Sequence, residues 1–125
     1  MGTRGASTLR NAPAQRQVID AHVHLSDSRF VEVEAVLERA REAGIEHMVM
    51  AGTEPKEWAR QRALAAAHPN LSMSFGLHPW EATDLSVVEE AVDLLRRALD
   101  GEDPPTAIGE TGLDRSGPHG SYIES

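Results

Sequence analysis

The sequence predicts an α/β fold built on a parallel sheet, and two observations carry this prediction. Strand-like and helix-like segments alternate beyond residue 16 at spacings of about 25 to 35 residues, which is typical of successive βα units. The composition, with 40% hydrophobic and 26% charged residues, is that of a globular domain. Only 4% of the residues are aromatic, so the core is expected to be mostly aliphatic.

The first βα unit is expected to begin with an apolar strand over residues 17–24. A helix over residues 30–43 should follow, with N-caps available from the Ser-Asp-Ser stretch at 26–28 and a stop at Gly44. A second strand is expected near residues 46–51, where Met, Val and Met follow one another.

The second helix is expected to open at Thr53-Glu54-Pro55, because proline is tolerated in a first helical turn. Pro69 should close it, and Trp58 is expected to serve helix packing. A third strand follows near residues 71–77.

The third helix is predicted to start with a capping box formed by Ser86 and Glu89 and to end at Gly101. A fourth strand is expected near residues 106–110. The helix should bury a stripe of apolar side chains, namely Val88, Ala91, Val92, Leu95, Ala98 and Leu99.

The charge is unevenly distributed along the chain. Residues 1–16 contain three arginines and no acid, and we expect them to form a disordered basic extension. The rest carries nine basic against twenty acidic side chains, which argues against a broad phosphate-binding surface of Lys and Arg, although bound divalent cations would still attract nucleic acid. No cysteine is present, so His, Asp and Glu are the available metal ligands. Without a run of about 18 apolar residues or a secretory signal, we expect a cytoplasmic protein with no membrane contact.

The end of the first strand carries an unusual set of polar side chains. Side chains alternate along a strand, so His22 and His24 should point to the same side, where two neutral imidazoles can share one cation. Two ordinary polar residues at a strand end are the alternative. An apolar strand that delivers Asp20 and both histidines to its carboxyl end is hard to explain as packing.

Two later strand ends carry further candidates. Gly76-Leu77-His78-Pro79-Trp80 follows the third strand, and an exposed histidine in a turn is its simpler interpretation. Glu110 follows the fourth strand between two glycines, where a carboxylate is costly unless a cation or a donor receives it; the alternative is a solvated loop residue. The other histidines, His47, His68 and His119, are expected to take no part in chemistry.

Three segments together resemble a known family. IDAHVHL at 19–25, GLHPW at 76–80 and AIGETGLD at 107–114 are similar to the first three signatures of the TatD-like metal-dependent deoxyribonucleases, a group of barrel amidohydrolases. The resemblance runs from about residue 17 to residue 114. It implies the N-terminal half, with four strands and three helices, of a TIM-type (β/α)8 barrel.

The resemblance also implies roles for individual residues. His22 and His24 would bind the first of two divalent metal ions, and Glu110 would bridge both; zinc, manganese and magnesium are the candidates. His78 would lie near substrate, and Asp114 would support the site. Asp20 is a candidate to orient one of the histidines. The substrate would be DNA or a small phosphodiester; no protein partner is implied.

The sequence departs from the family after the third signature. Family members place two further histidines and a proton-handling Asp on later strands, and no segment here matches those signatures, so no catalytic residue is assigned. Residues 115–125 form a divergent polar tail, which suggests a truncated or frame-shifted product or a fragment. The 125-residue chain is therefore expected to be inactive alone. A hydrolase of small esters or amides on the same scaffold and a non-catalytic remnant remain alternatives.

Overall fold

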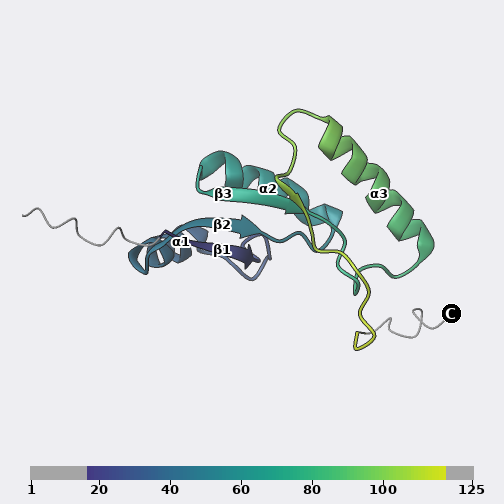
Figure 1. The fold of residues 1–125 in the computed structure, drawn as a ribbon, viewed down its shortest axis with the longest axis horizontal. Helices are drawn as coiled ribbons and strands as arrows, with labels where there is room; N and C mark the ends of the chain where they lie inside the picture. Colours follow the sequence, from purple (N-terminus) through teal and green to yellow (C-terminus); the bar gives the residue numbers. More distant parts are fainter. Residues whose placement is uncertain (1–16, 118–125) are drawn as a thin grey trace, which may run out of the picture.

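The computed structural model describes residues 17–117 of the chain (Figure 1). The expected basic extension over residues 1–16 lies outside the described residues, as do His119 and the end of the expected polar tail. Strands and helices alternate in the predicted order: β1 (Val18–Val23), α1 (Val33–Glu42), β2 (Ile45–Met50), α2 (Pro55–Ala67), β3 (Leu71–Phe75), α3 (Leu85–Asp100) and β4 (Ala107–Ile108).

The four strands form one parallel sheet in the order β1-β2-β3-β4. Each strand therefore pairs with its neighbour in the sequence, and the order never reverses as it does in a doubly wound sheet. The sheet curls, and its order is that of half a (β/α)8 barrel. This confirms the predicted fold class.

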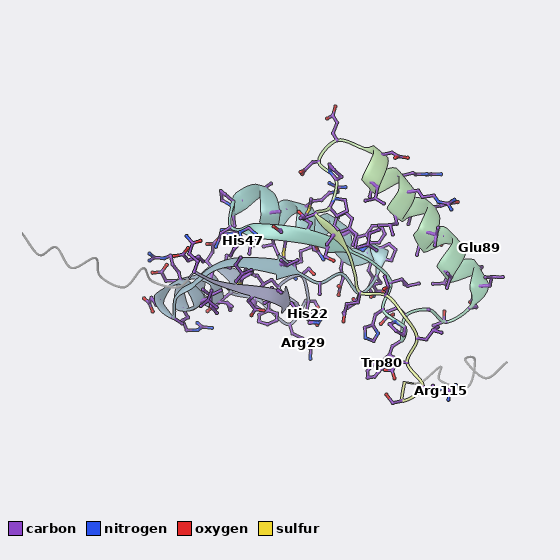
Figure 2. The ribbon with its side chains drawn as sticks, viewed as in Figure 1. His22, Arg29, His47, Trp80, Glu89 and Arg115 are labelled. Atoms are coloured by element: carbon purple, nitrogen blue, oxygen red, sulfur yellow. The ribbon has the colours of Figure 1, made fainter. Side chains whose placement is uncertain are left out.

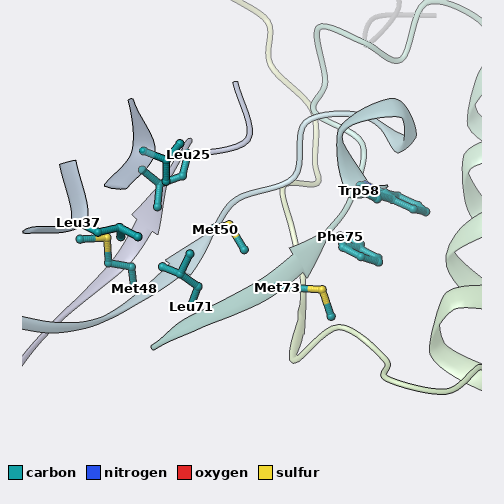
Figure 3. Packing of buried hydrophobic residues seen from close by; sticks show 9 residues of the cluster. Leu25, Leu37, Met48, Met50, Trp58, Leu71, Met73 and Phe75 are labelled. Atoms are coloured by element: carbon teal, nitrogen blue, oxygen red, sulfur yellow. The ribbon is translucent and has the colours of Figure 1, made fainter. Parts of the chain in front are cut away.

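The core lies around the first three strands and the two helices that follow β1 and β2. Trp58 of α2 stacks on Phe75 of β3 with ring centroids 4.8 Å apart, so the expectation that Trp58 serves packing is confirmed (Figure 3). As the composition indicated, most of the other members are aliphatic or Met. The buried cluster consists of Leu25, Val33, Leu37, Met48, Met50, Trp58, Leu71, Met73 and Phe75.

Two helix starts differ from the prediction. The capping box of Ser86 and Glu89 is wrong: Asp84 is the N-cap of α3, and its carboxylate accepts hydrogen bonds from the Val87 N–H and the Ser86 hydroxyl. The cap lies earlier because the helix begins at residue 85. The 26–28 stretch does not cap α1, which begins at residue 33 after Glu32 without a side-chain cap. Gly101 ends α3 as predicted.

The apolar stripe predicted for α3 is only partly covered. Ala91 is buried, and Leu95 and Ala98 pack against the core, but Val92 and Leu99 each remain 40% exposed. Figure 1 shows α3 standing apart from the sheet. Among the helices of residues 17–117, none combines the length and the hydrophobicity that a membrane-spanning helix needs.

Candidate metal centre

Side chains from the two edges of the sheet meet at the carboxyl ends of the strands. The Nε2 atom of His22 lies 3.4 Å from Oε1 of Glu110, and the Nε2 atom of His24 lies 3.8 Å from Oε2 of the same carboxylate. The two imidazole Nε2 atoms are 3.1 Å apart. One ligand atom from each residue lies within 4.8 Å of the others, so the three side chains can reach a single cation.

The histidines reach this position from an irregular part of β1. Asp20 pairs with Met48 of β2 and Val23 with Met50, so β1 holds one residue more than its partner between these points. Such a bulge bends a strand and redirects its side chains. The Asp20 carboxylate accepts a hydrogen bond from the backbone N–H of His22 at 3.1 Å. Asp20 therefore contacts the backbone of a ligand candidate. That it orients a histidine ring stays a prediction.

Glu110 is held by its backbone. Its N–H donates to the carbonyl of Gly52 at 2.7 Å, and the carbonyl of the preceding Gly109 accepts from the Ser74 hydroxyl at 3.1 Å. A Cβ atom at Gly76 would collide with the backbone of Glu110. A Cβ at Gly52 would lie 2.6 Å from the Ser74 carbonyl oxygen. Glycine is therefore required at 76 for the segment after β4 to approach the end of β3 this closely, and at 52 for the ends of β2 and β3 to approach each other.

The donor set fits a divalent cation. Glu110 Oε2 is buried and has no hydrogen-bond partner among residues 17–117. A buried carboxylate oxygen without a partner is costly, and a cation would remove the cost. Two ring nitrogens that face each other at 3.1 Å likewise suit a shared proton or a shared metal ion. The His22 and His24 side chains are 55% and 39% exposed, which leaves the centre open to a substrate.

A polar cleft of about 310 Å³ adjoins this cluster. His78 lines it but does not join the three ligand candidates. The Nδ1 atom of His78 accepts a hydrogen bond from the backbone N–H of Trp80 at 3.0 Å, so the neutral ring carries its proton on Nε2. The cleft is lined by His24, Asp27, Arg29, Thr53, Glu54, Glu57, His78, Trp80, Glu81 and Glu110.

Asp114 lies apart from the three ligand candidates and contacts Trp80 instead. Its Oδ2 accepts from the indole Nε1 at 2.9 Å, and its Oδ1 accepts from the hydroxyl and the N–H of Ser116. The hydrogen bonds from Ser116, with a smaller contribution from Trp80, hold the pKa of Asp114 below its usual range. Asp114 therefore contacts a residue of the cleft wall, and the supporting role that the resemblance implies for it stays a prediction.

The sequence reasoning missed part of the cleft wall. Arg29 comes from the loop after β1, and Thr53, Glu54 and Glu57 come from the start of α2 directly after β2. The sequence does carry a signal for them, because these residues also follow strand ends. The Thr53 hydroxyl donates to Glu57 at 2.7 Å, so these two residues start helix α2 and line the cleft at the same time.

The remaining histidines within the described residues make structural contacts. His47 shares a hydrogen bond of 2.6 Å with the Ser72 hydroxyl on the neighbouring strand β3 and is partly buried. His68, at the end of α2, lies 3.0 Å from the Glu34 carboxylate of α1. Neither is part of the cluster of His22, His24 and Glu110.

Fold and side-chain geometry together define a (β/α)-barrel segment whose candidate metal centre lies at the carboxyl ends of its strands. Comparison with known proteins agrees with this class. The family model for TatD related DNase matches residues 19–123, and the chain belongs to this family. The family resemblance noted in the sequence is thereby confirmed.

Individual relatives give the same result. The chain is 37% identical over 99 residues to the 3'-5' ssDNA/RNA exonuclease TatD of Pantoea ananatis, and 40% identical over 100 residues to the protein of that name from Erwinia amylovora. It is 36% identical over 101 residues to the uncharacterized metal-dependent hydrolase YjjV of Escherichia coli. The first two matches cover 78% of this chain and 37% of each relative, and the third covers 79% and 38%. The chain thus spans a little over a third of the length of these relatives.

Proposed function

We propose that this chain supplies His22, His24 and Glu110 as ligands of a divalent metal in a hydrolase that cleaves phosphodiester bonds, with DNA as the expected substrate. The convergence of these three side chains carries the proposal. The buried Glu110 oxygen that lacks a hydrogen-bond partner among the described residues supports it. So do the relatives, two of which are named as single-stranded DNA/RNA exonucleases and one as a metal-dependent hydrolase.

The charge of the cleft supports a role for metal. Among its lining residues are five carboxylates, those of Asp27, Glu54, Glu57, Glu81 and Glu110. These charges repel a phosphate, so an anionic substrate needs a compensating cation in the cleft. A bound divalent ion would supply that charge and would lower the pKa of a coordinated water.

The chain's own groups have separate tasks in this proposal. The neutral imidazoles of His22 and His24 bind through Nε2, and Asp20 fixes the backbone of the first one. His78 carries its proton on Nε2 and can donate it to a phosphate oxygen in the cleft, because its Nδ1 is already an acceptor. That donation orients the phosphate and partly offsets its charge.

We propose two ions, of zinc, manganese or magnesium, with Glu110 between them. Oε1 lies 3.4 Å from His22 and Oε2 lies 3.8 Å from His24, so the carboxylate borders the position that both histidines share. One of its oxygens would bind the ion held by the two histidines, and the other would be left for a second ion. The remaining ligands of the second ion would come from outside residues 17–117. Histidine with carboxylate suits zinc and manganese better than magnesium.

Titration with cobalt(II), a spectroscopic substitute for zinc, tests the ligand set. The wild-type chain should bind cobalt with a visible absorption band, and Glu110→Gln or the double variant His22→Ala, His24→Ala should bind it more weakly by at least about 10-fold, the effect that even groups orienting a ligand produce. His68→Ala is the matched control and should leave the affinity unchanged. Equal cobalt affinity in Glu110→Gln and wild type would contradict the proposal.

Hydrolysis distinguishes the substrate classes. The 125-residue polypeptide is expected to cleave neither single-stranded DNA nor a small phosphodiester above the His22→Ala, His24→Ala background, because one ion keeps only three ligands here. Fusion to the C-terminal part of a relative should restore metal-dependent cleavage. The acidic cleft supports the second candidate, a small ester or amide substrate, which the fusion protein would then cleave in preference to DNA. Metal-dependent cleavage by the unaided chain that is lost in Glu110→Ala would contradict the expected inactivity.

A further inference from the structure

Trp80 stands out in the cleft because its ring is both exposed and fixed. The side chain is 50% exposed and lies in the loop between β3 and α3, outside the buried core cluster. Figure 2 shows it below the sheet, close to the segment that follows β4. Its Nε1 donates to Asp114 at 2.9 Å, and its ring meets the His78 ring edge-to-face with centroids 5.4 Å apart. Gly117 lies so close that a Cβ atom there would collide with the indole.

These contacts satisfy the polar atom of the indole and leave part of its apolar surface in water. An exposed tryptophan that packing does not require is a candidate for ligand contact, and its fixed orientation reduces the entropy lost when a planar ligand stacks on it. Stacking on a protein aromatic ring is also how unpaired nucleobases are bound without a strict sequence preference.

Arg29 adds a fixed positive charge to the same cleft. Its Nε and Nη2 donate to both oxygens of Asp27, at 3.0 and 2.8 Å, and its side chain is 86% exposed. Asp27 does not occupy Nη1, which remains for a further acceptor. Of the residues within 17–117 that line the cleft, Arg29 is the only Lys or Arg. A planar guanidinium held in place by a carboxylate is suited to a phosphate.

We propose that Trp80 and Arg29 form a nucleotide subsite beside the candidate metal centre, with the nucleobase stacked on Trp80 and a neighbouring phosphate bound by Arg29. This inference rests on the proposed function, because the candidate ligands His24 and Glu110 line the same cleft. The cleft volume of about 310 Å³ is at the small end for ligand sites, which suits a single nucleotide unit. Stacking requires an unpaired base, so the subsite selects single strands.

Binding of pentathymidylate to the full chain tests the subsite, with an abasic deoxyribose-phosphate pentamer as the probe that carries the same phosphates without bases. Calorimetry should show that Trp80→Ala weakens pentathymidylate binding by about 5- to 100-fold, whereas Trp80→Phe keeps most of the affinity. The abasic pentamer should bind weakly, and equally to wild type and Trp80→Ala. Intrinsic tryptophan fluorescence should be quenched by pentathymidylate alone.

The Arg29 contact has its own readout. Arg29→Ala should lower the slope of log affinity against log salt by about 0.7, the change expected for one lost phosphate contact on a single strand. Arg41→Ala is the matched control, because Arg41 is also paired with a surface carboxylate, that of Glu38, but does not line the cleft. Its slope should equal that of the wild type.

The experiment runs in EDTA and again with magnesium, which separates this inference from the metal proposal. If pentathymidylate binds Trp80→Ala and Trp80→Phe as tightly as wild type, or the abasic pentamer binds wild type equally well, the stacking subsite is wrong. Absence of pentathymidylate binding in both buffers overturns it too. If pentathymidylate binding in EDTA depends on Trp80 while Glu110→Gln and wild type bind cobalt equally well, the subsite is supported and the proposed metal ligands are wrong.

Discussion

Helices α2 and α3 follow neighbouring strands of the same sheet but contact it differently. Helix α2 buries Trp58 against Phe75 and buries Gln61 completely. Helix α3 is the longer and more regularly amphipathic of the two, yet within the described chain it buries only Ala91. An apolar cavity of about 270 Å³ lies between Trp58, α3 and the segment after β4. An apolar stripe predicts a helix and its inward face, and it does not set how closely that face approaches the sheet.

The difference matters for the site because α2, and not α3, supports the strand ends. The side-chain amide of Gln61 donates to the Ser74 carbonyl at 3.0 Å and accepts from the Ser74 N–H at 3.1 Å. The Ser74 hydroxyl in turn donates to the carbonyl of Gly109, next to Glu110. A buried polar side chain on α2 is therefore connected through Ser74 to the backbone next to a ligand candidate.

The sharpest test of the comparison replaces a buried ring under α2. Phe75→Ala should lower the free energy of unfolding by about 3–5 kcal/mol, because it leaves a cavity beneath Trp58. Leu99→Ala on α3 should cost less than about 1 kcal/mol, since that side chain is already 40% exposed. Urea denaturation measures both values. Similar losses in the two variants would show that α3 packs as closely as α2.

The second test removes the polar support. Gln61→Leu keeps an apolar body of similar size but leaves the N–H and carbonyl of Ser74 without their buried partner. We expect a loss of about 2–4 kcal/mol in unfolding free energy, and a weaker cobalt affinity because Glu110 loses its anchor. The exposed Gln17→Leu is the control and should change neither quantity. If folded Gln61→Leu binds cobalt as tightly as wild type, α2 does not support the metal ligands.

Much of the fold and the candidate ligand set could be predicted because both depend on local rules. Period-two and helical patterns mark the elements, and parallel strands place all their carboxyl ends at one edge, so His22, His24 and Glu110 were expected along the same edge of the sheet. The curl of the sheet then brings the three side chains together. The contacts of Asp20 and Asp114 could not be predicted, since a one-residue bulge and a loop conformation decide which atom each carboxylate meets. Both features depend on how segments distant in the sequence pack together, which the spacing of residues along the chain does not determine.

The third test concerns the exposed apolar surface of α3. Val92 and Leu99 are each 40% exposed, and β1 and β4 are the unpaired edges of the described sheet. We expect the chain to self-associate and to bind a hydrophobic dye such as ANS. Val92→Glu combined with Leu99→Glu should reduce both signals several-fold, while Glu89→Gln on the exposed side of the helix should not. A monodisperse, sharply melting monomer without dye binding would contradict the expectation.

The smallest effect is expected at the start of α3, where Asp84 replaces the predicted capping box. Hydrogen bonds from the Ser86 hydroxyl and the Val87 N–H stabilise the charged carboxylate and lower the pKa of Asp84 below its ordinary value of 3.8. A lowered pKa means that the cap contributes fully above pH 3.8 and that its contribution is lost as the pH falls through the folded-state pKa. Asp84→Ala should therefore lower the melting temperature by a few degrees at pH 7, and by less at about pH 2. Asp84→Asn keeps an N-cap acceptor without a titrating group, so it should retain most of the stability at pH 7 and remove this part of the acid dependence. If Asp84→Ala and wild type differed equally at both pH values, the carboxylate would not be acting as a charged cap, and α3 would begin where it does for reasons of packing alone.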